Sequence, residues 1–124
     1  MIIKRGSIFN VALGEKIGSV QCGVRPVLII QNDIGNKYST TTVGIPLTSK
    51  RSKRNLPTHK VLNNYGKLVD KSTVLAEQIC TIDKSQIINY ICDIREEDLK
   101  EINKKIAISL ALGNYLEVFY VIGK

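Results

Sequence analysis

Arg25 and Thr48 are the side chains whose types and positions best fit a chemical role. Arg25 precedes Pro26, and because proline keeps the residue before it out of the helical region, Arg25 is expected to be extended where a strand begins. Thr48 ends the next predicted strand. A guanidinium matches phosphate oxygens with a planar fork of donors, and a hydroxyl both donates and accepts. Such a pair could stabilise charge on a phosphate, and in RNA the substrate's own 2′-hydroxyl can be the nucleophile.

The other reactive side chains form no familiar catalytic set. His59 is the single histidine, so no histidine pair exists for acid–base catalysis, and its role stays open between structural and auxiliary. The three cysteines, at positions 22, 80 and 92, lack a paired C-x-x-C spacing, which argues against a zinc site or a disulfide framework. The carboxylates have no metal-binding spacing, and no phosphate-binding glycine loop of known type is present.

Short predicted strands must position these residues. The run Val27–Ile30 holds four large apolar residues between Gly23 and a polar turn, which predicts a central strand buried on both faces. Pro46 cannot donate to a ladder, so it is expected at an edge, a bulge or a strand end. The further strands are expected at residues 7–13, 41–48, 58–62, 72–82 and 87–92, and a turn is expected at residues 32–37.

A single helix follows the strands. Asp93 and Glu96 have capping-box spacing, and a cap one or two residues later fits equally well. Leu99, Ile102, Ile106 and Leu110 recur at helical spacing, and Gly113 can end the helix. We therefore expect a domain at residues 1–113, mainly β with a C-terminal helix and built as a small β-barrel or half-barrel, and an apolar C-terminal extension at 114–124. Dimer formation would cover the apolar surface that so small a barrel leaves open.

Length and charge restrict the class of protein and of partner. A chain of 124 residues with 44% hydrophobic and 23% charged residues fits one ordinary soluble domain. A net charge of +7 suits an anionic partner, although a basic protein without such a partner fits as well. The cation-rich loop at residues 49–57 is either a solvated face or a contact to a phosphate backbone. No signal peptide and no membrane span are evident, so a cytoplasmic location is expected.

Four motifs, taken in order, resemble the MazF/PemK (Kid) toxins of bacterial type II toxin–antitoxin systems, and most closely MazF of Gram-positive bacteria. They are Gly23–Val27, Ile30–Asn36, Leu56–His59 and Glu77–Lys84. The resemblance implies an SH3-like barrel that forms a homodimer. It also implies a ribosome-independent endoribonuclease that cuts single-stranded RNA, chiefly mRNA, at a short sequence motif without a metal or other cofactor. A cognate MazE-like antitoxin would bind across the dimer and block the RNA site.

The resemblance also implies which residues act. The catalytic arginine and threonine of the family fall on Arg25 and Thr48. The hypothesis is attack by the ribose 2′-oxygen on the adjacent phosphorus, with Arg25 stabilising negative charge, Thr48 holding a phosphate oxygen, and His59 or water helping with proton transfer. The residues that would line the RNA groove are Ser19, Gln21, Lys53, Arg54, Leu56, Glu77 and Gln78.

This sequence departs from the family pattern at three places. Cys80 stands where arginine is usual, Pro46 stands where a small residue is usual, and the apolar tail beyond Leu112 is longer than usual. Two alternatives stay open. One is a gyrase-binding toxin of the same fold, in which Arg25 and Thr48 would have no role. The other is an RNA-binding module whose catalytic site has been disabled.

Overall fold

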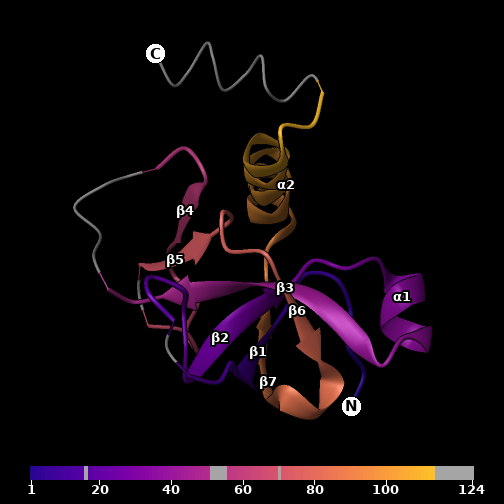
Figure 1. Ribbon diagram of the computed structural model, residues 1–124. Helices are drawn as coiled ribbons and strands as arrows, with labels where there is room; N and C mark the ends of the chain where they lie inside the picture. Colours follow the sequence, from indigo (N-terminus) through magenta and orange to yellow (C-terminus); the bar gives the residue numbers. More distant parts are fainter. Residues whose placement is uncertain (16, 51–55, 70, 114–124) are drawn as a thin grey trace.

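The computed structural model describes residues 1–15, 17–50, 56–69 and 71–113 (Figure 1). The helices are α1 (Asp33–Tyr38), α2 (Glu96–Leu110) and a 3-10 turn, η1 (Lys84–Gln86). The strands are β1 (Ser7–Ala12), β2 (Val24–Ile29), β3 (Thr41–Thr48), β4 (His59–Leu62), β5 (Ser72–Leu75), β6 (Cys80–Asp83) and β7 (Ile87–Asp93). The prediction of a mainly β fold with a C-terminal helix is confirmed. The predicted extension at 114–124 lies outside the described residues.

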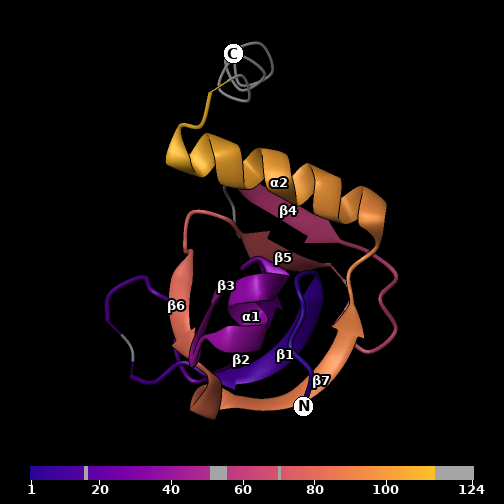
Figure 2. The same ribbon diagram turned by 90° about the vertical axis from the view of Figure 1, so that its right-hand side faces the viewer.

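The strands form one antiparallel sheet in the order β4-β5-β3-β2-β1-β7, and β6 also pairs with β3. Figure 2 shows this sheet curving round on itself, with α2 lying across the end formed by β4 and β5. Three of the six consecutive strand pairs, β1–β2, β2–β3 and β4–β5, are antiparallel neighbours, and antiparallel pairing throughout is typical of a small barrel.

Strand β2 lies at the centre of the sheet and sends side chains to two hydrophobic cores. Leu28 packs with Ile45 in the core that also contacts α2, while Val27 and Ile29 pack in a second core with Phe9. Because side chains alternate along a strand, one strand can serve both cores. Val27, Leu28 and Ile29 have no exposed surface, so the prediction of a strand buried on both faces is confirmed.

Strand β3 exchanges one partner for another along its length. It pairs with β6 through Gly44 and with β5 from Leu47 onwards, and Pro46 lies between these two pairings. The carbonyl of Val43 accepts from Ile30 on the β2 side. Since backbone groups alternate sides along a strand, the missing N–H of Pro46 faces the gap between β6 and β5. The proline therefore costs the sheet no ladder hydrogen bond.

Gly44 lies where β2, β3 and β6 approach most closely. A Cβ added at this position would be 2.5 Å from Val27 Cγ1 and 2.9 Å from Ile82 Cδ1. These distances are shorter than side-chain contacts allow, so any larger residue would push the strands apart.

One predicted turn and one predicted strand are wrong. The predicted turn at 32–37 is helix α1, which begins where Asn32 Oδ1 accepts from Gly35 N at 2.8 Å. The predicted strand at 72–82 is two strands, because a turn at Ala76–Glu77 separates β5 from β6. The polar residues inside that apolar run lie at the turn and not on a strand.

At its start, α2 has its cap two residues after Asp93, the later of the expected positions, and its end differs from expectation. Asp93 belongs to β7 and accepts from Ser7 Oγ at 2.8 Å, so the helix begins after Arg95 without a side-chain cap. Ala111, with φ of 56°, takes the left-handed position that was expected for Gly113. No helix of the described residues is long and apolar enough to cross a membrane.

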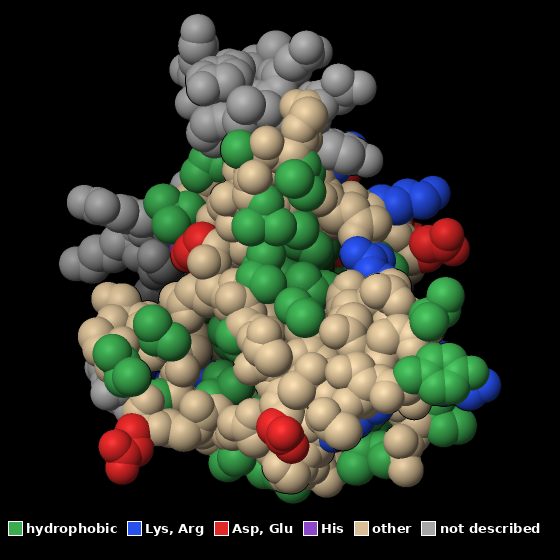
Figure 3. Space-filling view, turned by 45° about the vertical axis from the view of Figure 1, so that its right-hand side comes forward, with side chains coloured by type: hydrophobic (Ala, Val, Ile, Leu, Met, Phe, Trp, Pro, Cys, Tyr) green, Lys and Arg blue, Asp and Glu red, His purple; other side chains and the backbone are tan. Residues whose placement is uncertain are grey.

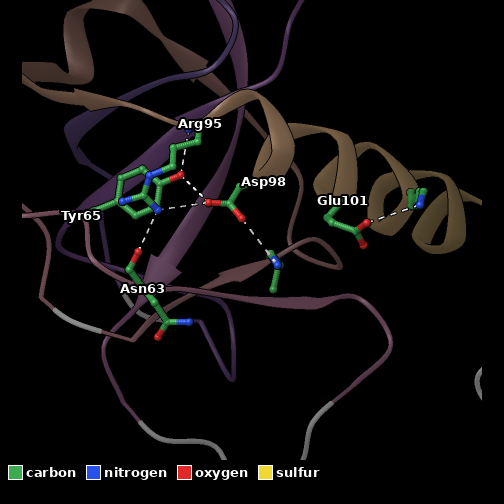
Figure 4. A network of polar contacts seen from close by, with 7 residues as sticks. Asn63, Tyr65, Arg95, Asp98 and Glu101 are labelled. Carbon is green, nitrogen blue, oxygen red and sulfur yellow. Dashed lines mark hydrogen bonds and ion pairs between the residues drawn. The ribbon is translucent and has the colours of Figure 1, made fainter.

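A polar network fixes the start of α2 to β4 and to the loop that follows β4 (Figure 4). Tyr65 Oη donates to Asp98 Oδ2 at 2.5 Å and accepts from Arg95 N at 2.8 Å. The Arg95 guanidinium lies over the Tyr65 ring, 4.1 Å from its centroid, and donates to Asn63 O at 2.9 Å. Lys60 Nζ lies 3.6 Å from Asp98 Oδ1. Burial and the bond to Asp98 raise the pKa of Tyr65 to about 12.

Candidate functional site

The register of β2 and β3 places Arg25 opposite Thr48. The ladder pairs Val27 with Pro46 and Leu28 with Ile45, and the same register continued by two residues sets Arg25 against Thr48. Directly opposite residues of antiparallel strands project to the same face of the sheet. Arg25 is two residues from Val27, and Thr48 is two residues from Pro46, the partner of Val27. Both side chains therefore project to the same face as Val27, which is the face away from α2.

The same argument places His59 on this face. Thr48 pairs with Thr73 of β5, and Thr73 pairs with Val61 of β4. His59 is two residues before Val61, so it projects to the same side as Thr48 and Arg25. Lys60, the next residue, projects to the other face and reaches Asp98 of α2, which supports this orientation of β4.

The Arg25 guanidinium has a backbone contact and no acidic partner among the described residues. Its Nε donates to Cys22 O at 2.9 Å, which anchors the side chain to the loop that precedes β2. None of the ion pairs between described residues includes Arg25. The Thr48 hydroxyl is nearly buried and accepts from Lys50 N at 3.2 Å, so it still has a proton to donate. A phosphate at this position would meet one cation and one hydroxyl donor.

Glu77 binds two residues at the start of β4. Its Oε1 accepts from Thr58 Oγ1 at 3.0 Å, and its Oε2 lies 2.9 Å from His59 Nε2. The His59 side chain is only 8% exposed, and that of Glu77 is 33% exposed. Burial raises the pKa of Glu77, but the hydrogen bonds from His59, the backbone and Thr58 outweigh it, so the pKa lies below its ordinary value. Glu77 is therefore an ionised carboxylate at neutral pH.

Gln78 holds the loop between β1 and β2. Its Oε1 accepts from Gln21 N at 3.0 Å, and its Nε2 donates to Ser19 O at 3.3 Å. Gln21 Oε1 is buried and has no hydrogen-bond partner among the described residues. The neighbouring residues Glu77 and Gln78 thus bind two different loops, one on each side of the β5–β6 turn.

The structure brings together most of the residues that the sequence nominates. Ser19 and Gln21 meet Gln78, while His59 meets Glu77 and also donates its backbone N–H to Leu56 O at 3.0 Å. Lys53 and Arg54 lie outside the described residues. The roles of all these residues in RNA binding or catalysis remain predictions.

Two residues of the site were not nominated from the sequence. They are Thr58, which donates to Glu77, and Cys22, whose carbonyl accepts from Arg25. Thr58 lies in the motif Leu56–His59, so its place beside His59 was visible, but its partner 19 residues away was not. A backbone acceptor such as that of Cys22 leaves no signal in residue types.

Cys80 has an inward, packing role. It pairs with Gly44 in the sheet, its Sγ lies 3.7 Å from Gly44 O, and it packs against the second core. Burial raises the pKa of its thiol, which makes the thiolate scarce at neutral pH. Within the described residues, no three His, Cys, Asp or Glu side chains are grouped so that they could hold a metal ion.

Comparisons with known proteins agree on one family. A family model described as PemK-like, MazF-like toxin of type II toxin–antitoxin system matches residues 4–110. Endoribonuclease EndoA of Bacillus subtilis (strain 168) is 43% identical over 117 residues, which cover 93% of this chain and 100% of EndoA. Endoribonuclease MazF of Staphylococcus saprophyticus is 39% identical over 112 residues, which cover 90% of this chain and 93% of that protein.

Solved structures share the fold. MazF from Deinococcus radiodurans superposes with a TM-score of 0.78 at 22% identity, covering 90% of this chain and 99% of the other. An endoribonuclease in complex with its cognate antitoxin from Mycobacterial species gives a TM-score of 0.72 at 25% identity, covering 89% and 96%. The predicted MazF-like barrel is confirmed. The chain belongs to the family of PemK-like and MazF-like toxins of type II toxin–antitoxin systems.

Proposed function

We propose that this protein cleaves single-stranded RNA, chiefly mRNA, at a short sequence motif, without the ribosome or a metal ion, through Arg25 and Thr48. Its homology to EndoA and MazF identifies it as an endoribonuclease toxin of a toxin–antitoxin system. The proposal adds the form of the substrate, the chemistry and the residues. The observation that carries it is the β2–β3 register, which sets Arg25 opposite Thr48 on the face that α2 does not cover.

The chemistry needs no side-chain nucleophile. The ribose 2′-oxygen attacks the adjacent phosphorus, the bond from phosphorus to the 5′-oxygen breaks, and the products carry a 2′,3′-cyclic phosphate and a 5′-hydroxyl. Arg25 stabilises the negative charge that grows on the phosphate, a role that a fixed cation performs well. Thr48 donates a hydrogen bond to a phosphate oxygen. Arginine is a poor general base because its pKa is above ~12, so proton transfer requires another group.

The proposed RNA groove follows the loops on either side of this pair. Ser19, Gln21 and Gln78 would form one wall, and the buried, unpartnered Gln21 Oε1 is an acceptor that a base N–H would satisfy. Leu56, 41% exposed, would line the other wall, and Glu77, held by Thr58 and His59, would bound the groove there without contacting a base. Lys53 and Arg54 belong to the same proposal as contacts to the phosphate backbone, and they lie outside the described residues.

We also propose a homodimer and a cognate MazE-like antitoxin. Figure 3 shows hydrophobic side chains gathered in the middle of one face of the molecule. Leu110 and Leu112, at the end of α2, are 54% and 52% exposed, and exposed apolar surface of this kind favours association. Solved relatives include an endoribonuclease with its cognate antitoxin and MazE–MazF assemblies from Deinococcus radiodurans. An mRNA substrate would place this action in the cytoplasm.

The test is incubation of the purified protein with a long single-stranded RNA in EDTA, followed by mapping of the new ends. Discrete cuts at one recurring motif are expected from the wild type and none from Arg25→Ala. Binding without cuts would indicate a disabled RNA-binding module, and inhibition of DNA supercoiling without cuts would indicate a gyrase-binding toxin. The intact pairing of Thr48 with Thr73 beyond Pro46 argues against a disabled site.

A further inference from the structure

The contacts of Glu77 do not suit a residue that reads RNA bases. A carboxylate recognises a base by accepting hydrogen bonds from it. Here Oε1 already accepts from Thr58, and Oε2 already contacts His59, within the folded protein. Each oxygen keeps a second lone pair, so a base could add a hydrogen bond only where the orientation fixed by Thr58 and His59 allows it. The geometry instead resembles the arrangement in which a carboxylate orients a histidine.

His59 lies on the sheet face that carries the proposed reaction centre. It projects to the same face as Arg25 and Thr48, and its side chain is held in a nearly buried position. Its Nε2 contacts Glu77, so Nδ1, at another corner of the ring, is the nitrogen available to a substrate. A histidine fixed in this way differs from one that simply fills space in a core.

The charges around His59 come from two directions. Glu77, on the β5–β6 turn, is in direct contact with it, and Arg25, on β2, projects to the same face. Lys60, the next residue along β4, points to the opposite face and pairs with Asp98. Among the described residues, the carboxylate of Glu77 is the charge that acts on the ring at contact distance.

We propose that His59 is the general acid of the cleavage reaction, and that Glu77 is a positioning residue for His59 and does not read the RNA. The inference rests on the endoribonuclease function proposed above. The 2′-oxygen forms a bond to phosphorus and its proton passes to water. The bond from phosphorus to the 5′-oxygen breaks, and His59 Nδ1–H gives its proton to that oxygen. His59 then regains a proton from solvent, while Glu77 stays ionised and holds the ring through Nε2–H.

The decisive experiment changes the leaving group. A short RNA containing one mapped cut site is made in two forms, one ordinary and one with sulfur in place of the 5′-oxygen at the scissile bond. A thiolate leaves without being protonated, so the sulfur substrate does not need a general acid. Single-turnover rates and substrate affinity are measured on both forms for the wild type, His59→Asn, Glu77→Gln, their double variant, and the control Lys60→Gln.

The proposal predicts a loss that depends on the substrate. His59→Asn should lower the rate on ordinary RNA by roughly 10²- to 10⁴-fold, the usual contribution of general acid catalysis, and should cut the sulfur substrate at nearly the wild-type rate. Glu77→Gln should lower the cleavage rate on ordinary RNA by a smaller factor, of at least about tenfold. Its affinity for RNA should be unchanged, and the sulfur substrate should restore its rate in the same way. Glu77→Gln should add nothing in the His59→Asn background. Lys60→Gln, next to His59 but with its side chain on the opposite face, should cut both substrates nearly as fast as the wild type.

Two results would overturn the proposal. Equal losses on both substrates would show that His59 has no role in protonating the leaving group. A Glu77→Gln variant with weakened affinity, and with a loss that adds to that of His59→Asn, would show that Glu77 contacts RNA. Binding of an RNA with a 2′-deoxyribose at the cut site verifies that each variant is folded, and His59→Gln replaces His59→Asn if the latter does not fold.

Failure of this inference is distinct from failure of the proposed function. A wild-type protein that cuts neither substrate would contradict the endoribonuclease itself. A wild type that cuts both, an Arg25→Ala variant that cuts neither, and no sulfur rescue of His59→Asn would contradict only the role of His59.

Discussion

Arg95, at the start of α2, and Arg25, on the opposite face of the sheet, both donate to backbone carbonyls, yet their remaining contacts differ. Arg95 binds the carbonyls of Asn63 and Asn64, lies over the Tyr65 ring and is 3.7 Å from Asp98. Within the described residues, the guanidinium of Arg25 has one hydrogen bond, to Cys22, and no ion pair.

This difference separates a structural arginine from one that is available to a ligand. A guanidinium has five donors, and those that the protein uses are lost to a phosphate. The donors and the charge of Arg95 stabilise the junction between α2 and the barrel. Arg25 is anchored by one nitrogen, and none of the described residues hydrogen-bonds to its other nitrogens or pairs with its charge.

The largest expected effect is that of Arg25→Ala on activity. The rate of RNA cleavage should fall by at least about 10³-fold, because the cation that stabilises the phosphate charge is removed. The free energy of unfolding should change by no more than about 0.5 kcal/mol, since Arg25 has few contacts to lose. Cleavage assays and urea denaturation measure the two quantities. A large loss of stability would show that Arg25 is structural and would remove the contrast with Arg95.

Tyr65→Phe should give the opposite result. Asp98 loses a donor and Arg95 N–H loses an acceptor, so the free energy of unfolding should fall by about 1–3 kcal/mol. Urea denaturation measures this loss, and the cleavage rate of the folded variant should stay at the wild-type value. A folded Tyr65→Phe variant with impaired cleavage would mean that the α2 junction also controls the site.

Alkaline pH tests the same junction without a mutation. The pKa of Tyr65 is raised from 10.0 to about 12 in the folded protein, so the folded state holds this proton more tightly than the unfolded state. The stabilising contribution is complete below about pH 10 and is lost as the pH rises towards 12. Thermal unfolding measured from pH 9 to 12 should show a steeper decline for the wild type than for Tyr65→Phe. Parallel curves would contradict this assignment.

Glu77 provides the smallest effect, at acidic pH. Its pKa lies below the ordinary 4.5, so its contribution to stability is complete above that pH and is lost as the pH falls below it. Wild type and Glu77→Gln should differ in the slope of stability against pH below about pH 4.5, and not between pH 6 and 8. The contribution is modest because the side chain is 33% exposed. If the stability of both proteins fell equally with pH below about 4.5, the hydrogen bonds of Glu77 to Thr58 and His59 would not persist in solution.

The central part of the site was predictable because it depends on local rules. Proline fixes the residue before it, and alternation fixes the face of a strand, so Arg25 and Thr48 could be nominated from spacing. The bonds of Gln78 to the β1–β2 loop could not, because its partners Ser19 and Gln21 lie almost sixty residues away. The resemblance to a known family grouped these residues, and the structure shows the contacts between them.

The errors in the fold prediction have a common physical origin. The segment at 32–37 contains residues that favour turns, and Asn32 is equally suited to cap a helix, which is what it does. Residues 72–82 form one long apolar run in the sequence, and the polar Glu77 and Gln78 mark the turn within it. In both places one residue type serves two local structures, and tertiary contacts decide between them.

Gly44 has a consequence for genetic selections. If a population of cells is rescued by random mutations in this toxin, substitutions at Gly44 should be recovered beside those at Arg25, because no side chain fits between Val27 and Ile82. The two groups of survivors would differ in abundance of the toxin: Arg25 variants would accumulate, and Gly44 variants would be degraded. A map of inactivating mutations therefore has to be sorted by protein level before any position is assigned to RNA cleavage.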